Sequence, residues 1–171
     1  LPAIQAARRS KDKGQEARIN QMCKQIASLA TIHMDPLKVK TAADARKEGV
    51  AWWALRAFRE LDDAVCRLRL NHSEVALVLL RAKGSAATVR ATDELLAANA
   101  KQGDWFVREV ANLVRRVLKR VDLTAKSFYA VADEGTQWCG SFLELLLACD
   151  RSYVKNDPGT KAVFGVTAAN G

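Results

Sequence analysis

Two short apolar runs of strand length stand far apart in the chain, with a long helical pattern between them. The runs cover residues 74–81 (EVALVLLR) and 127–132 (SFYAVA). A continuous apolar run of this length, bounded by turn residues, is typical of a buried parallel strand. Parallel strands need a crossover of about a dozen residues or more, which the intervening helix supplies. The sequence therefore predicts an α/β fold, with helices over both faces of a parallel sheet.

Apolar side chains recur every three or four residues in several other stretches, which indicates amphipathic helices. We expect helices over 15–33, 50–70, 92–100 and 141–149, and a long helix that has Asp104 as its N-cap. The three residues after position 70, Asn-His-Ser, end the second of these helices. Two further strand candidates cover 151–154 and 163–167.

The part of the chain before residue 50 differs from the rest. Residues 1–14 mix charges with Gly and Pro and show no period, and 34–49 have the composition of a linker. We therefore expect a charged arm, helix and linker over 1–49, which makes the N-terminal portion mainly helical, and a partial α/β domain over 50–171. The chain starts with Leu1, and we expect it to be a fragment of a longer protein.

The formal net charge is +8, from 27 Lys and Arg against 19 Asp and Glu, which favours anionic partners. Phosphorylated small molecules and nucleic acids both fit this charge. The sequence has no recognised nucleic-acid motif, so we keep a basic helical nucleic-acid-binding module only as an alternative. No apolar stretch approaches the roughly 20 residues that cross a bilayer, and we expect no membrane partner. The four cysteines lie far apart, which predicts reduced thiols in a cytoplasmic protein and no metal site.

The stretch most informative about chemistry is the strand, loop and helix over 127–150. Free N–H groups at such a helix start can bind an oxyanion, and Gly140 lets a ligand approach the backbone. Glu144, one turn further on, can move a proton in the same space. However, Ser141 and Glu144 also fit the S-x-x-E capping box, in which both only satisfy the helix end. The pattern leaves these two interpretations open.

Residues 128–154 resemble the crotonase, or enoyl-CoA hydratase/isomerase, superfamily. In that family a buried strand leads through a glycine-containing loop to a helix of the pattern G-x-x-x-E-L-x-L-x-x-D. Here these positions are Gly140, Glu144, Leu145, Leu147 and Asp150. Further blocks are similar to one branch, the benzoyl-CoA-dihydrodiol lyases: 51–69, 78–84, 105–110, 116–130 and 143–154.

The resemblance implies a truncated crotonase-like ββα spiral that binds a CoA thioester without a metal or a redox cofactor. It implies a lyase of aerobic aromatic degradation that opens the ring of a dihydrodiol of benzoyl-CoA, with C–C cleavage and release of formate. An enoyl-CoA hydratase or isomerase activity is the alternative. The backbone N–H groups of Thr92, Gly140 and Ser141 would form the oxyanion hole, Thr92 from a loop after the first strand. Glu144 and Asp133 would be the acid–base groups.

The chain departs from the lyase branch in the loop over 133–138. Branch members tend to have E-P-G-S-C-F there, whereas this chain has DEGTQW, so Asp133 keeps the acid on a shorter side chain. We expect a homo-oligomer, and we expect the fragment alone to show weak or no turnover, because family members continue with further strands and helices.

Overall fold

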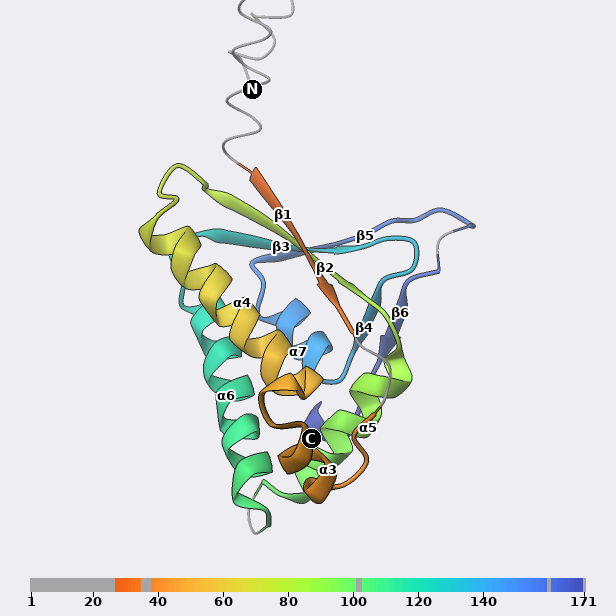
Figure 1. Cartoon of the computed structure of the whole chain (residues 1–171). Coiled ribbons are helices and arrows are strands. Elements are labelled where there is room, and N and C mark those ends of the chain that lie inside the picture. Colours follow the sequence, from red (N-terminus) through yellow and green to blue (C-terminus); the bar gives the residue numbers. More distant parts are fainter. Residues whose placement is uncertain (1–26, 35–37, 101–102, 160, 171) are drawn as a thin grey trace, which may run out of the picture.

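The computed structural model describes residues 27–34, 38–100, 103–159 and 161–170 (Figure 1). Its elements follow one another in this order: β1 (Ala27–His33), α3 (Ala42–Glu48), η1 (Gly49–Ala51), α4 (Trp53–Leu70), β2 (Leu77–Lys83), α5 (Ala86–Ala98), α6 (Trp105–Asp122), β3 (Ser127–Ala132), β4 (Gln137–Cys139), α7 (Ser141–Leu147), β5 (Arg151–Val154), β6 (Val163–Gly165) and η2 (Ala168–Asn170). Helices and strands alternate, so the predicted α/β class is confirmed.

The strands form two parallel sheets. Four strands pair in the order β1-β2-β3-β5, and β4 pairs with β6 in a second, two-stranded sheet. Two successive units of the chain, each with two strands and a helix, have the same order of elements. β3 and β5 start the two units in the large sheet, β4 and β6 follow in the small sheet, and α7 and η2 come last. This repetition is the expected ββα arrangement, and it brings the start of α7 next to the end of β6.

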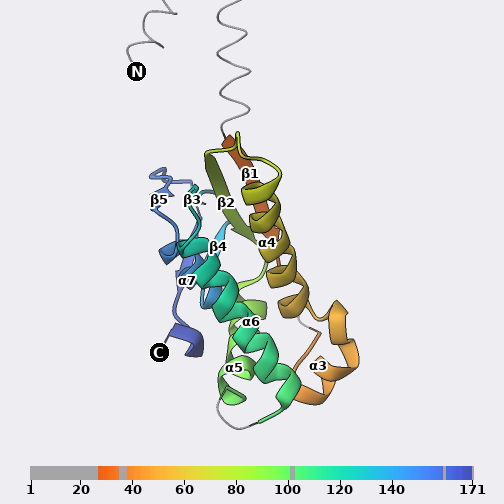
Figure 2. The same cartoon turned by 90° about the vertical axis from the view of Figure 1, so that its left-hand side faces the viewer.

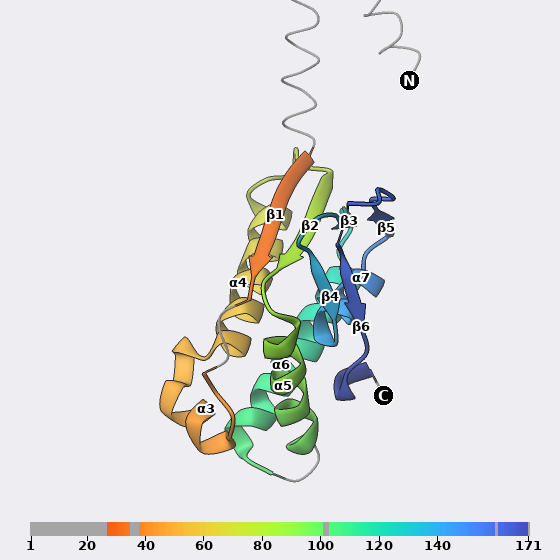
Figure 3. The same cartoon turned by 90° about the vertical axis from the view of Figure 1, so that its right-hand side faces the viewer.

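The helices cover one face of the four-stranded sheet. Figures 2 and 3 look from opposite sides, with α4 and α6 in front of the strands in the first view and behind them in the second. In β2 and β3 every second residue is buried, and most of the residues between them are half-buried. The prediction of helices over both faces is therefore wrong for the described residues. An apolar run does not show whether a strand is covered on one side or on two.

The core lies between this face and the helices. On α6, the side chains of Val107, Val110, Val114, Val117 and Val121 are all buried. Phe142 of α7 contacts the rings of Trp53 and Phe58 of α4, at centroid distances of 5.8 Å in both cases. These contacts fix α7 against α4 and thereby set the position of the helix that carries Glu144. None of the described helices is long and apolar enough to span a bilayer.

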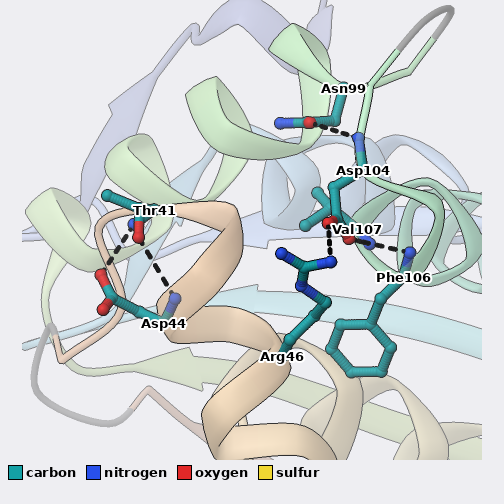
Figure 4. Close-up of polar contacts among 7 residues, drawn as sticks. All are labelled: Thr41, Asp44, Arg46, Asn99, Asp104, Phe106 and Val107. Atoms are coloured by element: carbon teal, nitrogen blue, oxygen red, sulfur yellow. Dashed lines mark hydrogen bonds and ion pairs between the residues drawn. The ribbon is translucent and has the colours of Figure 1, made fainter.

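Helices α3 and α6 both begin with a side-chain cap, and the cap of α6 also contacts α3 (Figure 4). Thr41 and Asp44 form a capping box at the start of α3. Asp104 caps α6 by accepting from the N–H of Phe106, at 2.9 Å, and its second oxygen pairs with Arg46 of α3 at 3.2 Å. The N-cap predicted for Asp104 is confirmed, and its ion pair also binds α3 to the start of α6.

Two predictions for the first fifty residues are wrong. Residues 27–33 form a strand, not the end of a helix, because they pair with β2 along seven residues and because Ala30 and Ile32 alternate toward the core. The predicted linker over 34–49 contains α3. The rest of the predicted helix, over 15–26, lies outside the described residues. The division of the chain at residue 50 stays a prediction.

The later elements agree more closely with the sequence. The helices expected over 50–70 and after Asp104, the strand over 127–132 and the strand over 151–154 are confirmed. The strand over 163–167 ends at Gly165, the helix over 141–149 ends at Leu147, and part of the loop before it is strand β4. The helix expected over 92–100 begins six residues earlier, at Ala86.

Candidate active site

A cavity of about 750 Å³ lies between α5, α6, α7 and η2. Its wall is mainly apolar, with alanines and aliphatic side chains from α5, α6 and η2, whereas α7 contributes Ser141 and Glu144. The charged side chains among its lining residues are Asp93 of α5, Arg115 of α6 and Glu144 of α7. A cavity of this size with a few polar groups on an apolar wall is typical of a small-molecule site.

The start of α7 at this cavity does not have the capping box that the sequence allows. The N-cap residue is Gly140, so Ser141 is already the first helical residue. Gly140 has no side chain that could cap the helix. Glu144 donates its backbone N–H to the Gly140 carbonyl oxygen at 3.1 Å, but its carboxylate does not bond back to the helix start. The capping interpretation of Ser141 and Glu144 is therefore wrong.

Asp93 supplies the missing cap from another helix. Its Oδ2 accepts the Ser141 N–H at 2.8 Å and the Thr167 hydroxyl at 2.8 Å. Its side chain is fully buried, and Oδ1 has no hydrogen-bond partner among the described residues. Burial raises the pKa of the Asp93 carboxyl, and the hydrogen bonds from Ser141 and Thr167 act in the opposite direction. The Asp93 carboxyl therefore accepts the hydrogen bond from the Ser141 N–H, the donor that was predicted to bind a substrate oxygen.

The glycine before α7 leaves room for this contact. Gly140 has φ +52, and a Cβ built on it would lie 1.8 Å from Asp93 Oδ2 and 2.5 Å from the Thr167 hydroxyl. The close approach that the sequence predicted at Gly140 is present, but the approaching group is a side chain of the chain itself. The Gly140 N–H donates to the Gly165 carbonyl oxygen at 3.0 Å in the small sheet.

Glu144 lies half-buried on the cavity wall and is held by a residue from the end of the chain. Asn170 Nδ2 donates to Glu144 Oε1 at 2.5 Å and to the Gly140 carbonyl oxygen at 3.1 Å. Among the described residues, none donates to the second carboxylate oxygen of Glu144. That oxygen is therefore available to a substrate, as general acid–base chemistry requires.

Thr92 lies inside α5, past its first turn, so the prediction that it lies in a loop is wrong. An N–H in the interior of an α-helix donates to the carbonyl group four residues earlier. The side chain of Thr92 is buried. The structure thus does not bring the Thr92 N–H to the start of α7 as a free donor, and its role in an oxyanion hole stays a prediction.

Asp133 and Glu144 do not meet in the described residues. Asp133 follows β3 and forms a two-point ion pair with Arg81 of β2, with Arg81 Nε 3.1 Å from Asp133 Oδ1. It is not among the residues that line the cavity. The carboxyl that the structure brings to the cavity beside Glu144 is Asp93 instead.

The sequence contained a signal for Asp93 that the prediction missed. Asp93 follows Val89 by four residues and precedes Leu96 by three, and both of these aliphatic side chains are buried on the inward face of α5. A carboxyl at such a position needs donors inside the fold. The helix predicted over 92–100 leaves out Val89, so the spacing of Val89, Asp93 and Leu96 on one helix face becomes clear only when α5 begins at Ala86.

The two cysteines near α7 do not offer a reactive thiolate. Burial raises the pKa of Cys149 to about 12 and also raises the pKa of Cys139. Both thiols stay protonated near neutral pH, so neither is an activated nucleophile. Among the described residues, no three His, Cys, Asp or Glu side chains form a group that could hold a metal ion.

No family model matches the chain. Among curated proteins, the chain is 43% identical over 131 residues to benzoyl-CoA-dihydrodiol lyase of Aromatoleum evansii. Over those residues, the chain is homologous to the lyase. The resemblance seen in the sequence is thereby confirmed. The match spans 77% of this chain but only 23% of the lyase, so the chain corresponds to less than a quarter of its relative.

Two solved structures are similar to parts of the chain. An enoyl-CoA hydratase/isomerase from Marinobacter aquaeolei has a TM-score of 0.44 and 16% identity, over 57% of this chain and 38% of its own. A putative enoyl-CoA hydratase from Streptomyces coelicolor A3(2) has a TM-score of 0.47 and 16% identity, over 74% of this chain and 42% of its own.

Proposed function

We propose that this chain carries the acid–base part of a lyase that acts on a CoA thioester and opens the ring of a dihydrodiol of benzoyl-CoA. The observation that carries the proposal is Glu144, which lines a cavity of about 750 Å³ in a chain homologous to benzoyl-CoA-dihydrodiol lyase. The apolar wall suits the acyl group of the thioester. Arg115 on the same wall suits a phosphate of CoA.

The chemistry needs a base and a place for negative charge. When one hydroxyl of the diol loses its proton, it becomes a carbonyl as the adjacent C–C bond breaks. The electron pair of that bond passes toward the thioester, whose oxygen gains negative charge. Glu144 takes the proton and returns it to the carbon that received the electron pair, and the Ser141 N–H stabilises the oxygen. These steps use proton transfer and charge stabilisation alone, so we continue to expect no metal or redox cofactor.

This proposal requires a rearrangement at Asp93. In the described arrangement the Asp93 carboxyl holds the Ser141 N–H, at 2.8 Å. A thioester oxygen can use that N–H only when Asp93 gives it up. The Gly140 N–H is bonded to the Gly165 carbonyl oxygen at 3.0 Å, so its part in an oxyanion hole stays a prediction. The roles of Thr92 and Asp133, the homo-oligomer and the cytoplasmic location also stay predictions.

Calorimetry with benzoyl-CoA tests the proposal, with a random DNA duplex at matched salt as the competing partner. Ala97 is exposed, lies on helix α5 and lines the cavity, so Ala97→Trp should fill the cavity without disturbing the core. Its matched control is Ala64→Trp, at an exposed position of α4 away from the cavity.

We expect the full chain to bind benzoyl-CoA, and we expect Ala97→Trp to weaken this binding by about tenfold or more, which is about 1.4 kcal/mol. Ala64→Trp should bind as the unchanged chain does. Salt-sensitive binding of the duplex without binding of the thioester would overturn the proposal in favour of the nucleic-acid alternative.

A further inference from the structure

The short turn after β6 is closed by a hydrogen bond of its own and makes three more to residues beside the cavity. Asn170 Oδ1 accepts the Thr167 N–H at 2.8 Å, and Asn170 Nδ2 donates to Glu144 Oε1 and to the Gly140 carbonyl oxygen. The Thr167 hydroxyl donates to Asp93 Oδ2 at 2.8 Å. Both carboxyl groups that line the cavity, Asp93 and Glu144, are therefore bound by residues of this turn.

The three hydrogen bonds of Asn170 determine which way its amide group points. The two protons on Nδ2 match the two acceptors, Glu144 Oε1 and the Gly140 carbonyl oxygen. If the amide group were reversed, its oxygen would face two acceptors and its nitrogen would face the Thr167 N–H. The side chain thus fits the site in one orientation only, with its donors toward Glu144.

We propose that Asn170 is a positioning residue for Glu144 in the lyase reaction, and this inference rests on the proposed function. A glutamate side chain on a helix surface has several rotatable bonds and samples many directions. The bond at 2.5 Å fixes one carboxylate oxygen beside the start of α7 and leaves the other free to exchange a proton with a substrate. Asn170 acts through Glu144 and itself takes no proton.

Asn170 also links Glu144, the proposed base, to the peptide whose N–H is the proposed oxyanion donor. Because one nitrogen binds both Glu144 and the Gly140 carbonyl oxygen, the carboxylate is held at a fixed place relative to the peptide that joins Gly140 to Ser141. That peptide carries the N–H proposed to bind the thioester oxygen. A base and an oxyanion donor that are displaced by about 1 Å relative to each other lose about 100-fold in rate.

Asn170→Asp is the variant that isolates this role. Its side chain has the same shape and can still accept the Thr167 N–H, but it no longer donates and puts a second carboxylate against Glu144. Asn156→Asp is the matched control, because Asn156 is exposed in the segment after β5 and does not line the cavity. Steady-state kinetics of ring opening and thermal melting are measured for the unchanged chain and for each variant, alone and combined with Glu144→Gln. All are made in a version of the chain extended to the length of the lyase relative, because we expect the fragment alone to show weak or no turnover.

We expect Asn170→Asp to lower kcat by about 100-fold, with KM nearly unchanged, and Asn156→Asp to leave both rate parameters unchanged. The melting temperature of Asn170→Asp should fall by a few degrees, because two hydrogen bonds are lost and two carboxylates meet. A residue that acts only through Glu144 adds nothing once Glu144 is removed, so the double variant should be no slower than Glu144→Gln alone. Wild-type kcat in Asn170→Asp, or losses that multiply in the double variant, would overturn the inference and leave the proposed function standing. Absence of turnover in the unchanged chain, once it is extended to the length of the lyase relative, would overturn the proposed function itself.

Discussion

Asp93 Oδ2 lies 2.8 Å from the backbone nitrogen of Ser141, so the first N–H of α7 is bound by a carboxyl from α5. This contact replaces the local capping box, and it needs the missing Cβ of Gly140, since a Cβ there would lie 1.8 Å from the same oxygen. The start of the helix that carries Glu144 is therefore fixed by a residue 48 positions away in the sequence.

Two glycines allow the cost of that contact to be separated from the cost of the backbone conformation. Gly140 has φ 52 and ψ −124, and Gly49 has φ 55 and ψ −123. A Cβ on Gly49 would have no atom within 4 Å. Gly49→Ala should cost about 1–3 kcal/mol of unfolding free energy from backbone strain. Gly140→Ala should cost about 1–3 kcal/mol more, because the new methyl group also clashes with Asp93.

Urea unfolding of the two alanine variants and the unchanged chain measures both costs. Equal losses for Gly49→Ala and Gly140→Ala would show that no carboxyl lies against Gly140 in solution.

The pH dependence of stability should report the burial of Asp93. Burial raises the pKa of this carboxyl above its ordinary value of 3.8, so the folded chain holds the proton more tightly than the unfolded chain does. Its contribution to stability is therefore full below pH 3.8 and is lost as the pH rises through the raised pKa. Asp93→Asn stays uncharged, and its oxygen can still accept from Ser141 and Thr167. The unfolding free energy of Asp93→Asn minus that of the unchanged chain should rise with pH from about 4 upward.

Urea titrations between pH 4 and pH 8 measure this difference. Asp122→Asn, at an exposed position of α6, serves as the control for the loss of one formal charge. A difference that stays flat, or that falls as the pH rises, would contradict a buried carboxyl with a raised pKa.

Local sequence patterns predict one residue of this site and miss the residues that contact it from other elements. Glu144 was found from the sequence because its helix start, its spacing from Gly140 and its family pattern all lie within a few residues. The S-x-x-E pattern, however, cannot show whether residue 140 or residue 141 is the N-cap, and the structure decides for Gly140. Asp93 and Asn170 act on Glu144 or on its helix from distant elements. The spacing of Asp93 on α5 shows at most that its carboxyl is buried, and no local pattern identifies the donors or acceptors that the two residues meet.

The same limit explains the errors in the fold. The strand over 127–132 was predicted correctly because all of its residues after Ser127 are aromatic or aliphatic and turn residues flank it. Residues 27–33 have apolar side chains at spacings that suit a helix as well as a strand, and pairing with β2 decides between the two. Because the pairing partner lies about fifty residues away, the first fifty residues were expected to be mainly helical.

The sequence predicts an acid–base role for Asp133, whereas the structure places it in an ion pair away from the cavity, and a variant distinguishes the two. Its carboxylate is paired with Arg81, and their side chains are 26% and 23% exposed, so Asp133→Asn should cost about 1 kcal/mol of unfolding free energy. Since Asp133 does not line the cavity, we expect kcat for ring opening to change by no more than a few-fold. A collapse of kcat in steady-state assays of Asp133→Asn would instead support the acid–base role predicted from the sequence.

The most direct test of the account is the turnover of Glu144→Gln, with a dihydrodiol of benzoyl-CoA as substrate, in a version of the chain extended to the length of the lyase relative. The glutamine oxygen can still accept from Asn170, so the melting temperature should stay nearly unchanged. The ionisable carboxylate is lost, so turnover should fall by about 100- to 10,000-fold. Turnover at the level of the unchanged chain would contradict the account, because it would show that Glu144 moves no proton in this reaction.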